Sequence, residues 1–160
     1  MNRENLDDLT IICPTYNRPH MLKRTLQYYA NNDFSCKIII ADSSDDTASE
    51  IVNNLLVEFS GSIDADYIKM PIDTELSKKL FESTNFVKTK YAIVIPDDDL
   101  VIRSALIKSM KELDSDRSVA AIYGNRISIA AISEPNDELG WIYSFPFYSV
   151  TIDQEDSINR

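Results

Sequence analysis

The sequence has 160 residues, of which 44% are hydrophobic and 26% charged, which is typical of a single globular domain. Its formal net charge of -10 argues against a nucleic-acid backbone or an anionic membrane surface as a partner. No apolar run is long enough to span a bilayer, and the N-terminus lacks a signal-peptide core. We therefore expect a soluble cytoplasmic protein without a transmembrane segment.

Residue usage excludes several kinds of site. His20 is the only histidine, which rules out zinc sites rich in histidine. The three glycines fit neither the P-loop pattern nor the dinucleotide-binding GxGxxG pattern, so any nucleotide must be held by another device. Cys13 and Cys36 each border an expected strand, and we expect both to be reduced core residues.

Along the chain, short apolar runs alternate with stretches of helical spacing. We expect strands at residues 9–13, 37–41, 66–70, 91–96, 119–123 and 126–132, with the third near an edge of the sheet. Helices are expected along Leu22–Leu26–Tyr29, Ile51–Leu55–Phe59, Leu76–Leu80–Val87 and Leu106–Met110–Leu113. This alternation predicts an α/β protein with a mostly parallel central sheet and helices on its faces.

Polar clusters follow three of these strands, at residues 14–18, 42–46 and 97–99. Because parallel strands end at the same edge of a sheet, the three clusters are expected around one crevice. The third cluster is three consecutive aspartates, whose mutual repulsion a divalent cation such as Mn²⁺ or Mg²⁺ would relieve. The alternative is a solvated acidic turn that caps the next helix.

The three clusters, together with the strands before them, resemble a known family. Residues 10–18 (TIICPTYNR) resemble the opening of family 2 glycosyltransferases, and residues 38–47 (IIIADSSDDT) are similar to its second strand and acidic loop. Residues 91–100 (YAIVIPDDDL) resemble the strand that carries its DXD motif. The motifs stand in the family's order, over about residues 8 to 125. The resemblance implies a GT-A-like fold, which is a Rossmann-like three-layer α/β/α domain, and a nucleotide-diphosphate sugar as donor.

Carried over residue by residue, the resemblance gives roles to the first two clusters. It implies that Pro14, Thr15 and Tyr16 line the base pocket and that Arg18 lies near the nucleotide. It also implies that Asp42 accepts a hydrogen bond from the base, which favours the imide N–H of uracil and hence a UDP-sugar.

In the third cluster the resemblance implies that Asp97 or Asp98 contacts the ribose. Asp99 would bind Mn²⁺ or Mg²⁺, with Asp97 as a second candidate ligand. The expected reaction is inverting transfer to an unknown glycan or lipid-linked acceptor, which requires a general base. The candidates are Glu155 and Asp156, which faintly resemble the family's late acidic pair.

Parts of the chain depart from the family pattern. Residues 75–85 stand where the family often has Ala-Arg-Asn, so only Lys78 or Lys79 can supply a positive charge there. From Ser133 the alternation weakens. We therefore expect a nucleotide-diphospho-sugar-binding core at residues 1–132, and at 133–160 the start of an acceptor-side or irregular segment of a longer protein.

Two other functions stay open at this point. One is a truncated nucleotide-sugar-binding module without catalysis. The other is a phosphohydrolase of the haloacid-dehalogenase type, whose DxDx[TV] motif residues 97–101 match formally.

Overall fold

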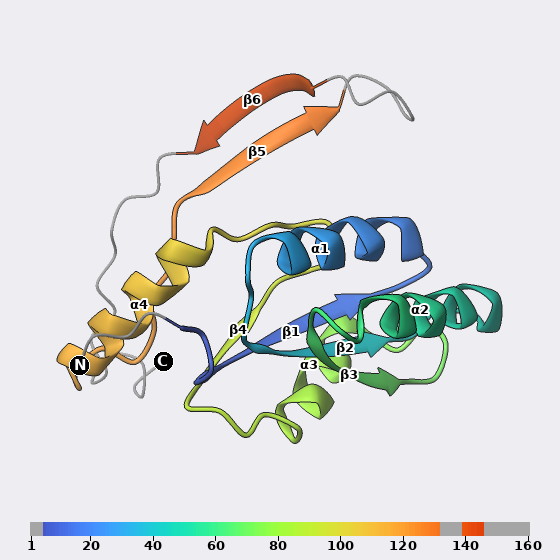
Figure 1. The fold of residues 1–160 in the computed structure, drawn as a ribbon, viewed down its shortest axis with the longest axis horizontal. Helices are drawn as coiled ribbons and strands as arrows, with labels where there is room; N and C mark the ends of the chain where they lie inside the picture. The colour runs from blue at the N-terminus through green and yellow to red at the C-terminus, as the bar shows by residue number, and fades with distance from the viewer. Residues whose placement is uncertain (1–4, 132–138, 146–160) are drawn as a thin grey trace. The chain divides into compact units, whose positions relative to one another are not determined.

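The computed structural model describes residues 5–131 and 139–145 (Figure 1). The chain divides into two compact units, Met1–Met110 and Lys111–Arg160, which we describe separately. The functional division expected at residue 132 stays a prediction. None of the described helices is long and apolar enough to cross a membrane.

The first unit is built on a parallel sheet of four strands. In chain order its elements are β1 (Leu9–Thr15), α1 (Pro19–Asn31), β2 (Lys37–Asp42), α2 (Asp46–Phe59), β3 (Asp64–Lys69), α3 (Leu76–Thr84), β4 (Tyr91–Val94) and the start of α4 (Arg103–Ser115). The strand order is β3-β2-β1-β4 and every pair is parallel. As predicted, the third strand lies at an edge.

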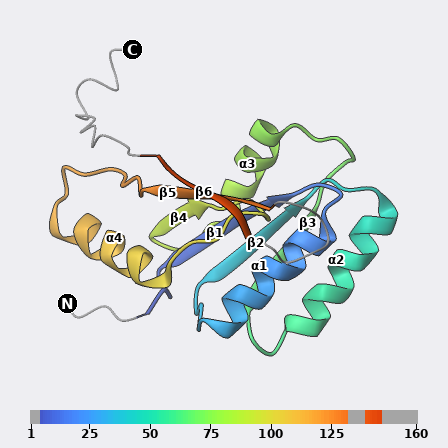
Figure 2. The same cartoon turned by 90° about the horizontal axis from the view of Figure 1, so that it is seen from above.

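Helices lie on both faces of this sheet. In Figure 2, α1 and α2 lie side by side on one face and α3 on the other. Since β1 is covered from both sides, all seven of its residues are buried. The predicted three-layer α/β architecture is confirmed.

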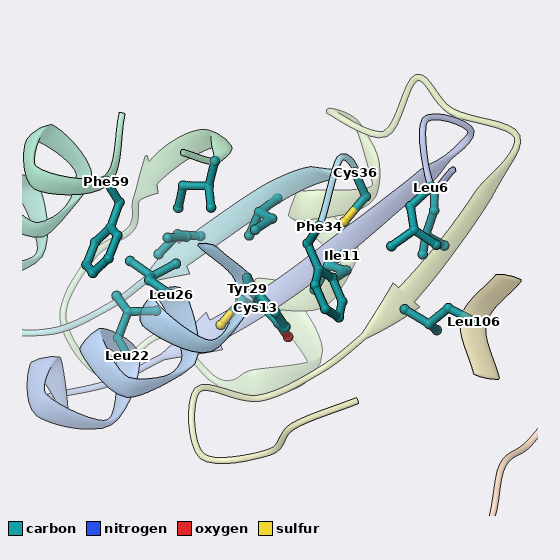
Figure 3. Packing of buried hydrophobic residues seen from close by; sticks show 14 of the residues in the cluster. Leu6, Ile11, Cys13, Leu22, Leu26, Tyr29, Phe34, Cys36, Phe59 and Leu106 are labelled. Carbon is teal, nitrogen blue, oxygen red and sulfur yellow. The ribbon is translucent and has the colours of Figure 1, made fainter. Parts of the chain in front are cut away.

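The main core fills the space between the sheet and the helix pair α1 and α2 (Figure 3). Alternate residues of β1 and β2, including Ile11, Cys13 and Ile38, meet Leu26 of α1 and Phe59 of α2. This period-2 alternation is what a strand with one face on a helix layer requires. The core therefore fixes the direction in which the carboxyl ends of β1 and β2 leave the sheet.

Both cysteines are buried and free, as expected. Burial raises the pKa of Cys36 to about 12 and raises that of Cys13 still further, so both thiols stay protonated at neutral pH.

Local signals explain where two of the helices begin. Pro19 stands at the first position of α1, where its missing N–H leaves no helical hydrogen bond unmade. Asp45 caps α2 by accepting a hydrogen bond from the backbone N–H of Ala48 at 2.9 Å.

The second unit corrects one expectation and adds an element. Residues 119–123 form no strand, because a strand needs a hydrogen-bonding partner and no described strand pairs with them. The strand expected at 126–132 is present as β5 (Arg126–Ala131), which pairs antiparallel with β6 (Leu139–Phe145). Strand β6 was not predicted from the sequence, although Leu139, Trp141, Tyr143 and Phe145 stand at every second position of this strand.

Candidate functional site

The three polar clusters meet around the end of β1. The register pairs Thr15 with Asp42, the last residue of β2. On the other side of β1, the Ile95 N–H donates to the carbonyl of Ile12 at 3.0 Å, which keeps the chain beyond β4 beside β1. The Thr15 hydroxyl then donates to the Asp97 carboxylate at 2.6 Å. Thr15 therefore stands between the two acidic clusters.

A tight turn gives the three aspartates of the triplet different environments. The Asp99 N–H donates to the carbonyl of Pro96 at 3.1 Å, which places Asp97 and Asp98 at the centre of the turn. Asp97 is fully buried, whereas Asp98 and Asp99 are exposed. Only the last two present carboxylates to solvent.

Asp97 anchors the turn to the rest of the site. Besides the bond from Thr15, its carboxylate accepts a hydrogen bond from Arg18 at 2.5 Å, and its backbone carbonyl accepts one from the Thr25 hydroxyl of α1 at 2.6 Å. Burial raises the pKa of Asp97, while the contacts with Thr15 and Arg18 act in the opposite direction. Arg18 also reaches Asp98, at 3.0 Å.

The Asp42 carboxylate is buried and uses its full hydrogen-bonding capacity within the protein. One oxygen accepts from the backbone N–H of Ser44, at 2.8 Å, and from the Ser44 hydroxyl. The other accepts from Ser49 and from Tyr67, each at 2.8 Å. Burial would raise the pKa of Asp42, but these hydrogen bonds together hold it below its ordinary value. Asp42 thus organises the loop between β2 and α2.

Helix α3 presents a polar face to the sheet. Its buried residues are Lys79 and Ser83, while Leu76 of the predicted apolar stripe is exposed. The Lys79 ammonium donates to the carbonyl of Thr15 at 2.7 Å and has no ion-pair partner among the described residues. Burial lowers the pKa of Lys79, although the nearby Asp42 and Asp97 carboxylates oppose this effect. Of the two lysines that the sequence singled out, only Lys79 faces the site.

These elements enclose an open cleft of about 510 Å³. It is lined by Pro14, Thr15, Tyr16, Arg18, Ser43, Asp73, Thr74, Leu76, Lys79, Pro96 and Asp98. The predicted residues Pro14 to Arg18 and Asp98 are therefore together in one cleft. Asp42 and Asp97 do not line the cleft, because both are fully buried beneath the residues that do.

Two features of the cleft were missed by sequence reasoning. Ser43 is 1% exposed, and its hydroxyl has no hydrogen-bond partner within the described residues. In the sequence, only the position of Ser43 next to Asp42 indicated that it could belong to the site. Across the cleft the Tyr16 hydroxyl donates to Asp73, whose carboxylate raises the pKa of Tyr16. Asp73 has a left-handed φ of 60° in an unremarkable stretch of sequence that gave no signal.

The exposed carboxylates of the triplet suit a divalent cation that takes only one or two of its ligands from the protein. Within residues 5–131 and 139–145, no three His, Cys, Asp or Glu side chains converge as a protein-only metal cage. Asp98 at the cleft and the exposed Asp99 beside it can offer one or two oxygen ligands. This donor set suits Mg²⁺ or Mn²⁺, which commonly take their other ligands from phosphate and water.

His20 is an exposed residue of α1. Glu155 and Asp156, the candidate bases, lie outside the described residues.

Comparisons with known proteins give the family and the fold of the chain. The model of the family described as glycosyl transferase family 2 matches residues 10–156. A mannosyltransferase from Pyrobaculum calidifontis, PcManGT, solved in complex with GDP-Man and Mn²⁺, superposes with a TM-score of 0.61 and 20% identity, covering 70% of this chain and 33% of that one. Residues 1–349 of S. aureus TarS give a TM-score of 0.57 and 15% identity, covering 74% of this chain and 34% of that one.

The chain thus spans about a third of the length of these solved structures. At this identity the likeness shows a shared fold, the GT-A-like α/β fold. A comparison with curated proteins gave no match.

Proposed function

Because the chain belongs to glycosyl transferase family 2, we propose that its cleft binds a nucleotide-diphosphate sugar for transfer of the sugar to an acceptor. The observation that carries the proposal is the arrangement around Thr15. This residue pairs with Asp42 in the sheet, donates to Asp97 and accepts from Lys79. α/β sheets commonly bind nucleotides at the carboxyl ends of their strands, where these groups lie.

Within this proposal the nucleobase binds in the inner part of the cleft, next to Ser43 and Lys79. The Ser43 hydroxyl is unpartnered among the described residues, and the Lys79 ammonium has donor hydrogens beyond the one given to Thr15. Asp42 can accept a base N–H only if one of its present donors leaves, so Ser43 is the more accessible acceptor. Uracil presents carbonyls beside an imide N–H and suits this pair, which makes UDP the first candidate. Guanine presents the same pair of groups, and the complex of PcManGT with GDP-Man makes GDP the competitor.

The acidic turn is the proposed place of Mn²⁺ or Mg²⁺, with Asp99 as the first ligand. Asp98 contacts either the ion or the ribose. Asp97 as a ligand for the ion or the ribose requires the loss of its contact with Arg18 or Thr15, so its part in the proposal is chiefly to fix the turn. When bound, the cation stabilises the negative charge that develops on the departing diphosphate.

Transfer also requires a carboxylate that takes the proton of the acceptor hydroxyl. Inversion at the sugar, a glycan or lipid-linked acceptor, and Glu155 or Asp156 as the base are the remaining parts of the proposal. The alternative is a module that binds nucleotide sugar without catalysis. Family membership gives no support to the phosphohydrolase.

A screen of donors tests the proposal. Thermal unfolding of the whole chain is followed with UDP-, GDP- and dTDP-sugars, each with Mn²⁺ and with EDTA. We expect uridine compounds to raise the melting temperature most, and only with Mn²⁺. If no nucleotide diphosphate changes the melting temperature in either condition, the proposal is wrong. A shift with equal size in EDTA would retain nucleotide binding but remove the metal.

A further inference from the structure

Arg18 bridges two carboxylates of the acidic turn from the beginning of α1. Its Nη2 lies 2.5 Å from Asp97 and its Nη1 lies 3.0 Å from Asp98. The two ends of this bridge differ in exposure. Asp97 is fully buried, whereas Asp98 is 44% exposed and Arg18 is 43% exposed.

The loop that carries Arg18 is held in place independently of these ion pairs. Asn17 has a left-handed φ of 51°, its backbone N–H donates to the Ser44 hydroxyl at 2.7 Å, and its side-chain oxygen accepts from the N–H of Asp45 at 3.0 Å. These bonds connect the loop after β1 to the loop after β2. The guanidinium is therefore presented to the turn by a preformed backbone.

The bridge gives the acidic turn a positive charge supplied by the protein itself. A cation that binds Asp98 must share its carboxylate with the Arg18 guanidinium. The two positive charges then lie close together and repel each other. An exposed ion pair is weak, because water screens it, whereas a pair with a buried carboxylate is held more firmly. The contact with Asp98 is thus the one that can be exchanged. The planar guanidinium also matches a phosphate group through two parallel N–H donors.

We propose that Arg18 is an internal counter-ion of the acidic turn that couples metal binding to nucleotide binding. With no nucleotide bound, it neutralises Asp98 and weakens the binding of a divalent cation. When the nucleotide enters with its cation, Arg18 stays on Asp97 and turns its Nη1 from Asp98 to the diphosphate. The inference rests on the proposed function, because it requires a diphosphate in this cleft.

Two affinities that change in opposite directions test this coupling. The first is the affinity for Mn²⁺ alone, and the second is the affinity for UDP at saturating Mn²⁺, both measured by calorimetry on the whole chain. For Arg18→Gln we expect Mn²⁺ alone to bind about threefold to tenfold more tightly, since the competing charge is gone. UDP should bind about tenfold more weakly, since a diphosphate contact is lost.

Arg18→Lys keeps the positive charge but removes the two parallel N–H donors of the guanidinium. It should restore the Mn²⁺ affinity towards that of the wild type but recover UDP binding only in part. Arg24→Gln is the matched control, because Arg24 is an exposed arginine of α1 that does not line the cleft and contacts Met21 Sδ at 3.7 Å. It should change neither affinity. Loss of folded structure would lower both affinities together, so it cannot imitate the expected pattern.

The outcomes separate this inference from the proposed function. If the wild type binds no UDP with Mn²⁺, and no GDP either, both fail. If the wild type binds UDP with Mn²⁺ but Arg18→Gln leaves the Mn²⁺ affinity unchanged or lowers it, only the counter-ion role is overturned. The same holds if Arg18→Gln leaves UDP affinity unchanged.

Discussion

At the scale of single residues, Asp42 differs most between its expected and observed surroundings. The resemblance implies a carboxylate facing a base, and the structure shows one that is fully buried and accepts hydrogen bonds from Ser44, Ser49 and Tyr67. Such a group stabilises the loop between β2 and α2. This loop contains Ser43, which lines the cleft, and Asp45, which caps α2. Its effect on nucleotide binding is therefore expected to be partly indirect.

Replacing Asp42 by Asn is expected to lower the free energy of unfolding by about 2–4 kcal/mol, because an amide N–H₂ replaces an oxygen that accepts from buried hydroxyl groups. Urea denaturation at pH 7 measures this change. Asp33→Asn is the control, since Asp33 is exposed and its left-handed φ of 53° suits Asn equally well. Equal stability of both variants would contradict the buried network.

The same carboxylate predicts a pH dependence. Hydrogen bonds hold the pKa of Asp42 below its ordinary value of 3.8 despite burial. A carboxyl group whose pKa falls on folding stabilises the native state above the unfolded pKa, and this contribution is lost as pH falls through the folded pKa. The stability difference between wild type and Asp42→Asn should therefore be constant above about pH 5 and narrow as the pH falls below about 3.8. Denaturation at a series of pH values tests this, and a difference that widens on acidification would contradict it.

The triplet shows what residue identity alone leaves undetermined. Asp97, Asp98 and Asp99 are identical in sequence, and the resemblance treats the first and last as metal ligands. A turn closed by a single backbone hydrogen bond buries the first and exposes the other two. That distinction depends on Thr15, Arg18 and Thr25, which are distant in sequence and meet the turn only in the fold.

At the scale of elements, α3 was predicted as a helix, but its end and the direction of its polar face were not. The spacing of Leu76 and Leu80 indicates helical periodicity correctly, whereas α3 ends at Thr84, before Val87. Leu76 is exposed and Lys79 is buried. The helix lies beside the cleft, where Lys79 donates to the carbonyl of Thr15. Periodicity reveals a helix, whereas the direction of its polar face depends on the neighbouring strand ends.

We therefore expect Lys79 to lower the stability of the folded protein and to increase its affinity for UDP. For Lys79→Met we expect a free energy of unfolding that is unchanged or raised by about 1–2 kcal/mol, because a buried charge without an ion-pair partner is removed. We expect UDP affinity at saturating Mn²⁺ to fall about tenfold, because a donor to the base is lost. Urea denaturation and calorimetry measure the two quantities.

The neighbouring lysine is the matched control for this prediction. The side chain of Lys78 is 63% exposed, on the outer surface of the same helix, and lies 3.8 Å from Glu82. Lys78→Met should change neither quantity appreciably. A Lys79→Met protein that loses stability but keeps full UDP affinity would assign Lys79 a structural role.

At the scale of the whole molecule, alternation of strands and helices was sufficient to predict the parallel sheet. The four strands of the first unit were all predicted. In β1 and β2 the signal is an apolar run that is buried on both faces, whereas β3 and β4 are only partly buried and were found from shorter apolar runs. The second unit was harder. Residues 119–123 have a strand composition but form no strand in the described structure, and β6 forms a strand that was not predicted although it is rich in aromatic residues. Composition alone therefore did not decide which of these segments pairs.

All the described residues of the candidate site belong to the first unit, and the central claim is that this unit binds a nucleoside diphosphate through a divalent cation at the acidic turn. The most direct test is calorimetric titration of the whole chain with UDP, in Mn²⁺ and in EDTA, for the wild type and Asp99→Asn. We expect the wild type to bind UDP in Mn²⁺ and to bind little UDP in EDTA, and we expect Asp99→Asn to lose at least about tenfold in affinity in Mn²⁺. Equal binding in EDTA, or an Asp99→Asn affinity equal to that of the wild type, would contradict it.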